Sequence, residues 1–195
     1  MAVYGYLISL GYAALCVALG SLLYFFGVPR IYTRKVVHIL IGAEWIILYR
    51  FMGGSVHFLV VALICTLLLL AEYHLKAVPA VSSDGDNAPG TVYYGAAMSL
   101  LAAVSLILPQ MMLPFGIAVF CTSVGDGAAG IFGQLIKGVN PTLYRKKTLL
   151  GYLFNLVFSF ISSYIFSITL APQLTPFDCL IIAFASSGVE LISVG

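Results

Sequence analysis

The sequence predicts an all-α protein: a polytopic transmembrane helical bundle of about seven spans, forming one integral membrane domain over residues 1–195. Two observations predict this class. Of the 195 residues, 62% are hydrophobic and 8% are charged, and the mean hydropathy is +1.08. The apolar residues are also gathered into several runs close to the roughly 20 residues that a helix needs to cross a bilayer. This composition excludes an ordinary soluble domain.

Turn residues and charges separate these runs. The first run carries no charge and ends at 27–30, where glycine, proline and arginine follow one another, and Thr33 is placed to cap the second helix. Gly53 and Gly54 turn the chain into the third run, and the polar segment 74–90 predicts an extramembrane loop. The predicted spans are 4–26, 33–49, 56–73, 91–108, 115–136, 149–170 and 177–194.

The fifth of these spans depends on a glycine-rich segment being helical. The apolar residues 115–124 are too few to cross alone, so the helix must continue through Gly-Asp-Gly at 125–127 as far as residue 136. Pro172 and Pro176 separate the last two spans. We find no internal repeat and no second domain.

The positions of the basic residues predict the orientation in the membrane. With the N-terminus outside, the loops after the first, third and fifth spans are cytoplasmic, and they contain eight of the nine lysines and arginines. Because cytoplasmic loops are enriched in these residues, this orientation is favoured. Only Arg50 falls outside; the other eight are Arg30, Arg34, Lys35, Lys76, Lys137, Arg145, Lys146 and Lys147.

Composition also excludes several functions. A net charge of +2 without a basic arm or patch excludes nucleic-acid binding. The four cysteines are dispersed singly, which indicates neither a zinc site nor a disulfide framework, so we expect reduced packing residues. They are Cys16, Cys65, Cys121 and Cys179. The first run lacks the basic start and cleavage site of a signal peptide, so we expect it to be a retained span.

The segment 122–151 contains the main candidate site. It places Asp126 among glycines, and four of the nine basic residues lie in it. Residues 125–130 match G-x-G-x-x-G, but an apolar helix precedes them instead of a strand, which excludes a dinucleotide fold. Helical spacing puts Asp126, Gly130, Gly133 and Lys137 on one face. Packing through small residues is the alternative for the glycines, whereas a carboxylate at membrane depth costs roughly 2.5–3.5 kcal/mol and usually has a function.

Other charged residues near helix ends form further candidates. Lys147 and Thr148, followed by Gly151 at a helix start, suit a phosphate, although basic residues there also anchor lipid headgroups. Arg34, Lys35 and His38 form a polar face at the start of the second span and are candidates for a functional site. Alternatively, the two cations only set the orientation of the chain in the membrane, and the histidine only forms a structural hydrogen bond. Glu44 and Glu190 are carboxylates within spans, and each needs a partner or a proton.

These motifs, in this order, resemble the polyprenol and lipid kinases, a group that includes dolichol kinase, phytol kinase and the CTP-dependent diacylglycerol kinase. Phosphatidate cytidylyltransferase is similar more distantly. The resemblance covers most of the chain from Thr33 to Glu190, and its order and spacing carry it. The matching residues are Thr33-Arg34-Lys35 with His38 and Gly42, Gly90-Thr91-Val92-Tyr93-Tyr94, Gly125-Asp126-Gly127-Ala128-Ala129 with Phe132-Gly133, Lys147-Thr148 with Gly151, and Glu190.

The resemblance implies a multi-pass enzyme that phosphorylates a lipid alcohol, either an isoprenoid alcohol of the dolichol or phytol type or diacylglycerol. CTP is then the phosphoryl donor and magnesium the cation. We expect Asp126 and Glu190 to hold the metal, and His38 and Lys147 to act with Asp126 in catalysis. The residues expected to bind the nucleotide are Arg34, Lys35, Gly125, Gly127, Gly130, Lys137, Lys146, Thr148 and Gly151.

Two other functions remain open. One is a cytidylyltransferase that joins CTP to a phosphorylated lipid, although a second aspartate shortly after the first, which that reaction's signature contains, is missing here. The other is a non-catalytic membrane transport or assembly subunit. Members of the resembled group continue past the position of Glu190 with a polar segment and a last apolar stretch, so we expect the chain to be C-terminally truncated at Gly195.

Overall fold

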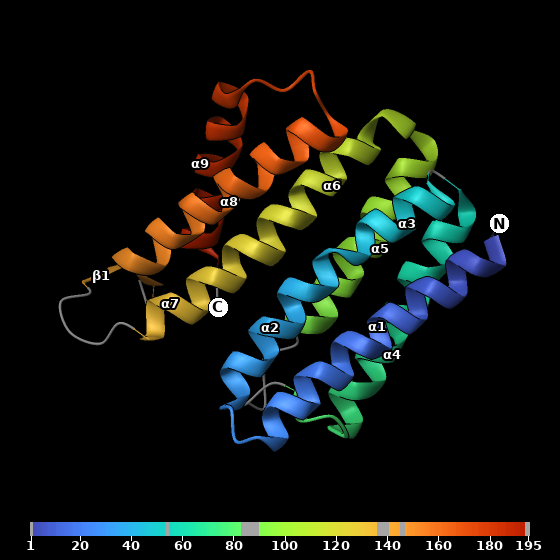
Figure 1. Cartoon of the computed structure of the whole chain (residues 1–195), viewed down its shortest axis with the longest axis horizontal. Coiled ribbons are helices and arrows are strands. Elements are labelled where there is room, and N and C mark those ends of the chain that lie inside the picture. The colour runs from blue at the N-terminus through green and yellow to red at the C-terminus, as the bar shows by residue number, and fades with distance from the viewer. Residues whose placement is uncertain (1, 54, 83–89, 136–140, 145–146, 194–195) are drawn as a thin grey trace. The chain divides into compact units, whose positions relative to one another are not determined.

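A computed structural model describes residues 2–53, 55–82, 90–135, 141–144 and 147–193, most of them helical (Figure 1). The chain divides into two compact units, Met1–Phe115 and Gly116–Gly195, and the division falls within helix α6. Among the described residues, five helical stretches are long and apolar enough to cross a membrane. They are Val3–Phe25, Val56–Leu75, Gly90–Ile107, Pro109–Gly133 and Leu149–Leu170. The all-α class is therefore confirmed, and the chain is consistent with an integral membrane protein, but seven spans are not confirmed.

The first unit is built from two sets of neighbouring helices. Helix α1 (Ala2–Phe25) lies along α2 (Arg30–Gly42) and α3 (Glu44–Met52), which follow each other end to end (Figure 1). Helix α4 (Val56–Leu75) packs mainly on α5 (Gly90–Ile107). The 3₁₀ turn η1 (Pro109–Met111) then leads into α6 (Met112–Phe120).

Glycine ends α1 as expected, but the start of α2 differs from the prediction. Gly27 has a φ of +85°, and the N–H groups of Gly27 and Val28 bond to the carbonyls of Tyr24 and Leu23. This is the Schellman motif, which favours glycine. Helix α2 begins at Arg30 after Pro29, so Thr33 is not its cap. Thr33 is buried inside the helix and donates to the carbonyl of Arg30.

The predicted second span is not one straight helix. Helix α2 ends at Gly42, and α3 begins at Glu44 after a single intervening residue. At the join the Ala43 N–H bonds to the carbonyl of Leu40, and the Ile46 N–H bonds to that of Ala43. These three-residue bonds tighten the backbone beside a glycine, which favours helix interruption. Neither piece reaches 18 residues.

Small residues bring the helices of the first unit close together, as is common in membrane bundles. A Cβ atom at Gly20 of α1 would lie 2.2 Å from Val37 of α2. One at Gly95 of α5 would lie 3.0 Å from the Thr66 hydroxyl of α4. Thr66 also shares a 2.9 Å hydrogen bond with Ser99. Gly20 therefore lets α1 lie close to α2, and Gly95 lets α5 lie close to α4.

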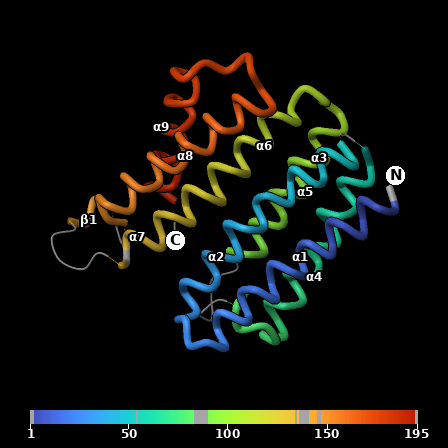
Figure 2. The backbone as a smooth tube through the Cα atoms, viewed as in Figure 1, coloured from blue at the N-terminus to red at the C-terminus, as the bar shows by residue number. Residues whose placement is uncertain are grey.

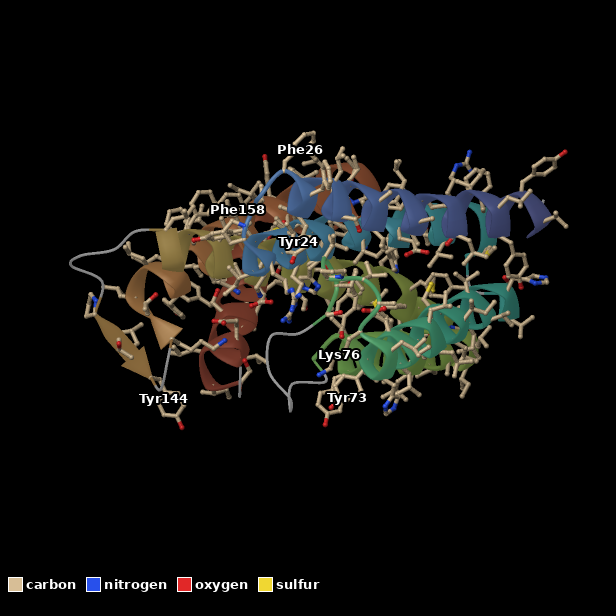
Figure 3. The ribbon with its side chains drawn as sticks, turned by 90° about the horizontal axis from the view of Figure 1, so that it is seen from below. Tyr24, Phe26, Tyr73, Lys76, Tyr144 and Phe158 are labelled. Atoms are coloured by element: carbon tan, nitrogen blue, oxygen red, sulfur yellow. The ribbon has the colours of Figure 1, made fainter. Side chains whose placement is uncertain are left out.

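The C-terminal end of α4 is fixed by an acid that the sequence did not single out. Lys76 ends this helix with a φ of 50°, and Figure 3 shows Tyr73 and Lys76 near each other at this end. The Glu72 carboxylate accepts hydrogen bonds from the Val78 N–H at 2.9 Å and from the Ser82 hydroxyl at 2.6 Å. The start of the predicted loop 74–90 is therefore held against its helix.

The second unit is crossed by a helix that continues through the Gly-Asp-Gly segment, as predicted. From α6 the path runs through a π-helical turn, η2 (Cys121–Asp126), into α7 (Gly127–Leu135) without interruption (Figure 2). A short hairpin not predicted from the sequence follows, formed by β1 (Thr142–Tyr144) and β2 (Lys147–Thr148). The exposed Tyr144 points away from the helices (Figure 3). Helices α8 (Leu149–Leu170) and α9 (Pro176–Ile192) complete the unit.

Candidate functional site

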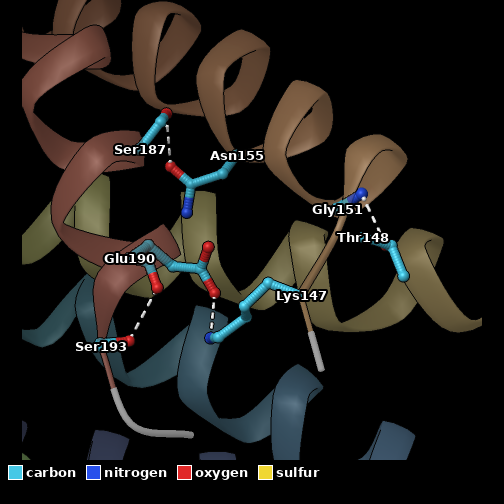
Figure 4. A network of polar contacts seen from close by, with 7 residues as sticks. All are labelled: Lys147, Thr148, Gly151, Asn155, Ser187, Glu190 and Ser193. Carbon is cyan, nitrogen blue, oxygen red and sulfur yellow. Dashed lines mark hydrogen bonds and ion pairs between the residues drawn. The ribbon is translucent and has the colours of Figure 1, made fainter. Parts of the chain in front are cut away.

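An ion pair in the second unit joins two residues that the sequence placed far apart. Lys147 on β2 bonds through Nζ to Glu190 Oε1 near the end of α9 (Figure 4). Their side chains are 23% and 13% exposed. Because a charge removed from water is costly without an opposite charge, the two side chains compensate each other in these partly buried positions. The predicted catalytic lysine and the predicted metal ligand are thus direct neighbours.

The start of α8 positions Lys147. Thr148 is the N-cap of this helix, and its hydroxyl accepts the Gly151 N–H at 3.2 Å. The Leu149 N–H bonds to the carbonyl of Pro141 at 2.9 Å. Two of the N–H groups expected to cradle a phosphate are therefore already bonded within the protein. Lys147 is the stronger candidate for meeting an anion at this helix start.

Glycines in η2 and α7 allow this helix to approach α8 closely. A Cβ atom at Gly125 would lie 2.3 Å from the Ser159 hydroxyl and 3.3 Å from Asn155 Oδ1. One at Gly133 would lie 3.2 Å from the Cα atom of Gly151. Small-residue packing therefore accounts for Gly125, Gly133 and Gly151. Gly127 is buried and Gly130 half-buried, and their predicted contact with a nucleotide stays a prediction.

Asp126 ends the π-helical turn and is half-buried. A π turn inserts an extra residue into a helix, and such turns are frequent at functional sites. Because Gly125 packs against Asn155 and Ser159, the backbone next to Asp126 is held against α8. Thr148 caps the start of that helix, and Lys147 directly precedes it.

A buried amide that the sequence analysis missed links these elements. Asn155 is 1% exposed, and its Oδ1 accepts hydrogen bonds from Ser159 at 3.1 Å and from Ser187 at 2.9 Å. Ser187 lies one helical turn before Glu190 on α9 (Figure 4). Both bonds are accepted by Oδ1, so this one oxygen joins two positions of α8 to α9. Polar residues at four-residue spacing in an apolar helix, 155, 159 and 163, are the signal that indicates such a network.

The candidate residues of α2 lie in the first unit. There the His38 ring meets the Tyr94 ring of α5 edge-on, with centroids 4.8 Å apart and planes at 68°. Two motif segments that are far apart in the sequence are therefore in contact. Arg34 and Lys35 are half-buried near the start of α2. Their predicted role beside the nucleotide stays a prediction, as does that of His38.

Two candidates, Lys137 and Lys146, lie outside the described residues. Within the residues that are described, no group of three or more histidine, cysteine, aspartate or glutamate side chains is arranged to hold a metal ion. Glu190 is moreover paired with Lys147. Magnesium is usually held by one or two carboxylates together with substrate phosphates and water. Asp126 and Glu190 therefore do not form a complete set of protein ligands for a metal. A magnesium ion here would need further ligands from a nucleotide and water.

Comparisons with protein-family models, with curated proteins and with solved structures find no match for this chain.

Proposed function

We propose that this chain is an integral membrane kinase that transfers a phosphoryl group from CTP to a lipid alcohol of the isoprenoid or diacylglycerol type. The observation that carries the proposal is the largely buried Lys147–Glu190 pair, held at the start of α8 in a highly apolar protein. Charged groups in such surroundings are costly and usually functional. The order of motifs from Thr33 to Glu190, and its resemblance to lipid kinases, favour phosphoryl transfer as that function.

The chemistry of phosphoryl transfer asks mainly for positioning and for neutralisation of charge. Lys147 is suited to balance phosphate charge, and Glu190 holds its amine in place until an anion competes for it. Asp126 is the carboxylate proposed to hold magnesium, which when bound would neutralise the phosphate oxygens. Asn155 and Ser187 join α8 to α9, the helix that carries Glu190. The roles of Arg34, Lys35, His38, Lys137 and Lys146 rest on the resemblance alone.

The proposed location of the reaction follows from the basic residues. With the N-terminus outside, the segment that contains Asp126 and Lys147 meets the cytoplasm, where nucleotides are available. The lipid hydroxyl then reaches the site from the inner leaflet.

The direct test is label transfer in the purified, full-length protein with magnesium and a panel of lipid alcohols. We expect γ-labelled CTP to yield a labelled lipid and CDP. Asp126→Asn and Lys147→Met should each lower the rate by roughly 100-fold or more, because each removes a group that stabilises transferring charge. Asp178→Asn, the same change at the capping acid of α9, should retain the rate.

Other results would contradict the kinase. Transfer from α-labelled CTP with release of pyrophosphate would identify a cytidylyltransferase. Full turnover in Asp126→Asn, or no labelled lipid from any alcohol, would favour a non-catalytic membrane subunit.

A further inference from the structure

The first unit contains a buried acid that plays no part in the proposed reaction. Glu44 is the first residue of α3, directly after the interruption at Ala43, and it is 6% exposed. The Ser9 hydroxyl of α1 donates a hydrogen bond to its Oε1. Ser9 is itself fully buried. Among the described residues, this is the only hydrogen bond that the structure gives the Glu44 side chain.

No cation faces this carboxyl in the described part of the chain. Arg50, on the same helix, is exposed, and six residues of separation place it on a different face. Arg34 and Lys35 precede Glu44 by nine or ten residues, about 14 Å along a helix. Helix α1 carries no charged residue, and the acid of α4, Glu72, is bonded at the far end of its helix.

The titratable groups around Glu44 do not compensate a negative charge either. Tyr12 and Cys16 on α1 and Cys65 on α4 lie within its electrostatic reach, and these side chains are neutral near pH 7. His38 on α2 lies six residues before Glu44 and meets the Tyr94 ring. The partial positive charge at the start of α3 favours the anion only weakly.

A carboxylate buried in this way loses its hydration and gains one hydrogen bond, which makes the ionised form much the more costly one. The neutral acid removes that cost and can still accept the bond from Ser9. We propose that Glu44 is a proton-binding site inside the first unit, held as a carboxylic acid at neutral pH. The ligand is the proton itself, and the site is independent of the proposed kinase reaction.

A protonated carboxyl in an apolar interior is the form that reacts with the hydrophobic reagent dicyclohexylcarbodiimide. The acid adds across a C=N bond of the reagent, and the acyl group then migrates to nitrogen, so that the whole reagent is retained. In the full-length protein reconstituted in liposomes at neutral pH, we expect mass spectrometry to find this adduct at Glu44. Labelling should fall as the pH rises.

Two acids of the same chain are matched controls. Glu190 is paired with Lys147 and Glu72 accepts two hydrogen bonds, so neither lies alone in an apolar interior, and both should stay unlabelled. Adducts at Glu72 or Glu190 without one at Glu44 would overturn the proposal. Protection of Glu44 by sodium ions at constant pH would overturn it too, because the site would then bind a metal cation.

Infrared spectroscopy decides the matter without any reagent. A protonated carboxyl has a carbonyl stretching band that shifts in heavy water, and it should disappear in Glu44→Gln, whose amide oxygen still accepts from Ser9. In Ser9→Ala the band should persist and move to higher frequency, because its hydrogen bond is lost. If Glu44→Gln removed carboxylate bands and left the protonated-carboxyl band unchanged, Glu44 would be ionised and the site refuted.

Discussion

Lys147 and Glu190 are separated by 43 residues, yet they form one partly buried ion pair in the second unit. Such a pair is weak evidence for stability, because desolvation of both charges offsets much of their attraction. Removing one partner leaves the other as an uncompensated charge, which is strongly destabilising. A loss of activity in a single variant is therefore ambiguous, and exchanging the two charges separates folding from chemistry.

We expect the exchanged variant Lys147→Glu with Glu190→Lys to fold nearly as well as the wild type. Each single change should destabilise the protein by less than the roughly 3–5 kcal/mol that breaking a fully buried pair costs, because both side chains keep some exposure. Thermal unfolding in detergent measures this recovery. Activity should not return, because the amine that meets the phosphate would then be attached to α9. Recovery of both properties would mean that the pair is only structural.

At the scale of elements, the contact of η2 and α7 with α8 depends on the absence of side chains. Gly125 and Gly133 meet Ser159 and Gly151 at distances that exclude an added Cβ atom without movement. Phe132 of α7 extends the same contact by stacking on Phe154 of α8, with ring centroids 4.6 Å apart. The backbone on either side of Asp126 is thus held by packing, which makes the site sensitive to small changes in volume.

Gly125→Ala should therefore destabilise the second unit by about 1–3 kcal/mol through overpacking, although alanine favours a helix. The matched control is Gly188→Ala in α9, where an added Cβ atom meets nothing within 4 Å. This control should be neutral or stabilise the protein by about 0.5–1 kcal/mol. Thermal melts of both variants and of Gly125→Ala with Ser159→Ala check the explanation. The double variant should recover part of the loss, and equal melts for both glycine variants would contradict close packing.

At the scale of the whole molecule, the number of crossings depends on α2 and α3. Among the described residues, five helical stretches are each long and apolar enough to cross a membrane. Helices α2, α3 and α9 are shorter, with 13, 9 and 17 residues. If α2 and α3 together cross once, the N-terminus and the end of α4 lie on opposite sides of the membrane. If they do not cross, the two lie on the same side.

Cysteine labelling distinguishes these topologies. In a chain whose four native cysteines are replaced by alanine, we expect a membrane-impermeant maleimide to reach Gln110→Cys, Gln173→Cys and an N-terminal cysteine from outside. Lys76→Cys should react only after the membrane is opened, because its loop is predicted to be cytoplasmic. If Lys76→Cys is labelled from the same side as the N-terminus, α2 and α3 together do not cross the membrane.

The sequence by itself determined the helical elements that depend on local composition. The predicted span 149–170 coincides with α8, because an apolar run between a basic segment and a proline-containing turn needs no distant partner to be recognised. Continuation of the fifth helix through Gly-Asp-Gly followed from the length that a membrane crossing requires. Asp126, Lys147 and Glu190 were likewise identifiable as charges that an apolar chain would not keep without a use.

The tertiary structure alone decided which of these groups meet. Pairing of Lys147 with Glu190, the Asn155 network, and the isolation of Glu44 beside Ser9 each join residues 32 or more positions apart. Helical spacing shows which face a side chain occupies, but it does not show which face of another helix lies opposite. The interruption at Ala43 and the π turn before Gly127 were likewise visible only in the structure, since the sequence predicted one continuous helix across each position.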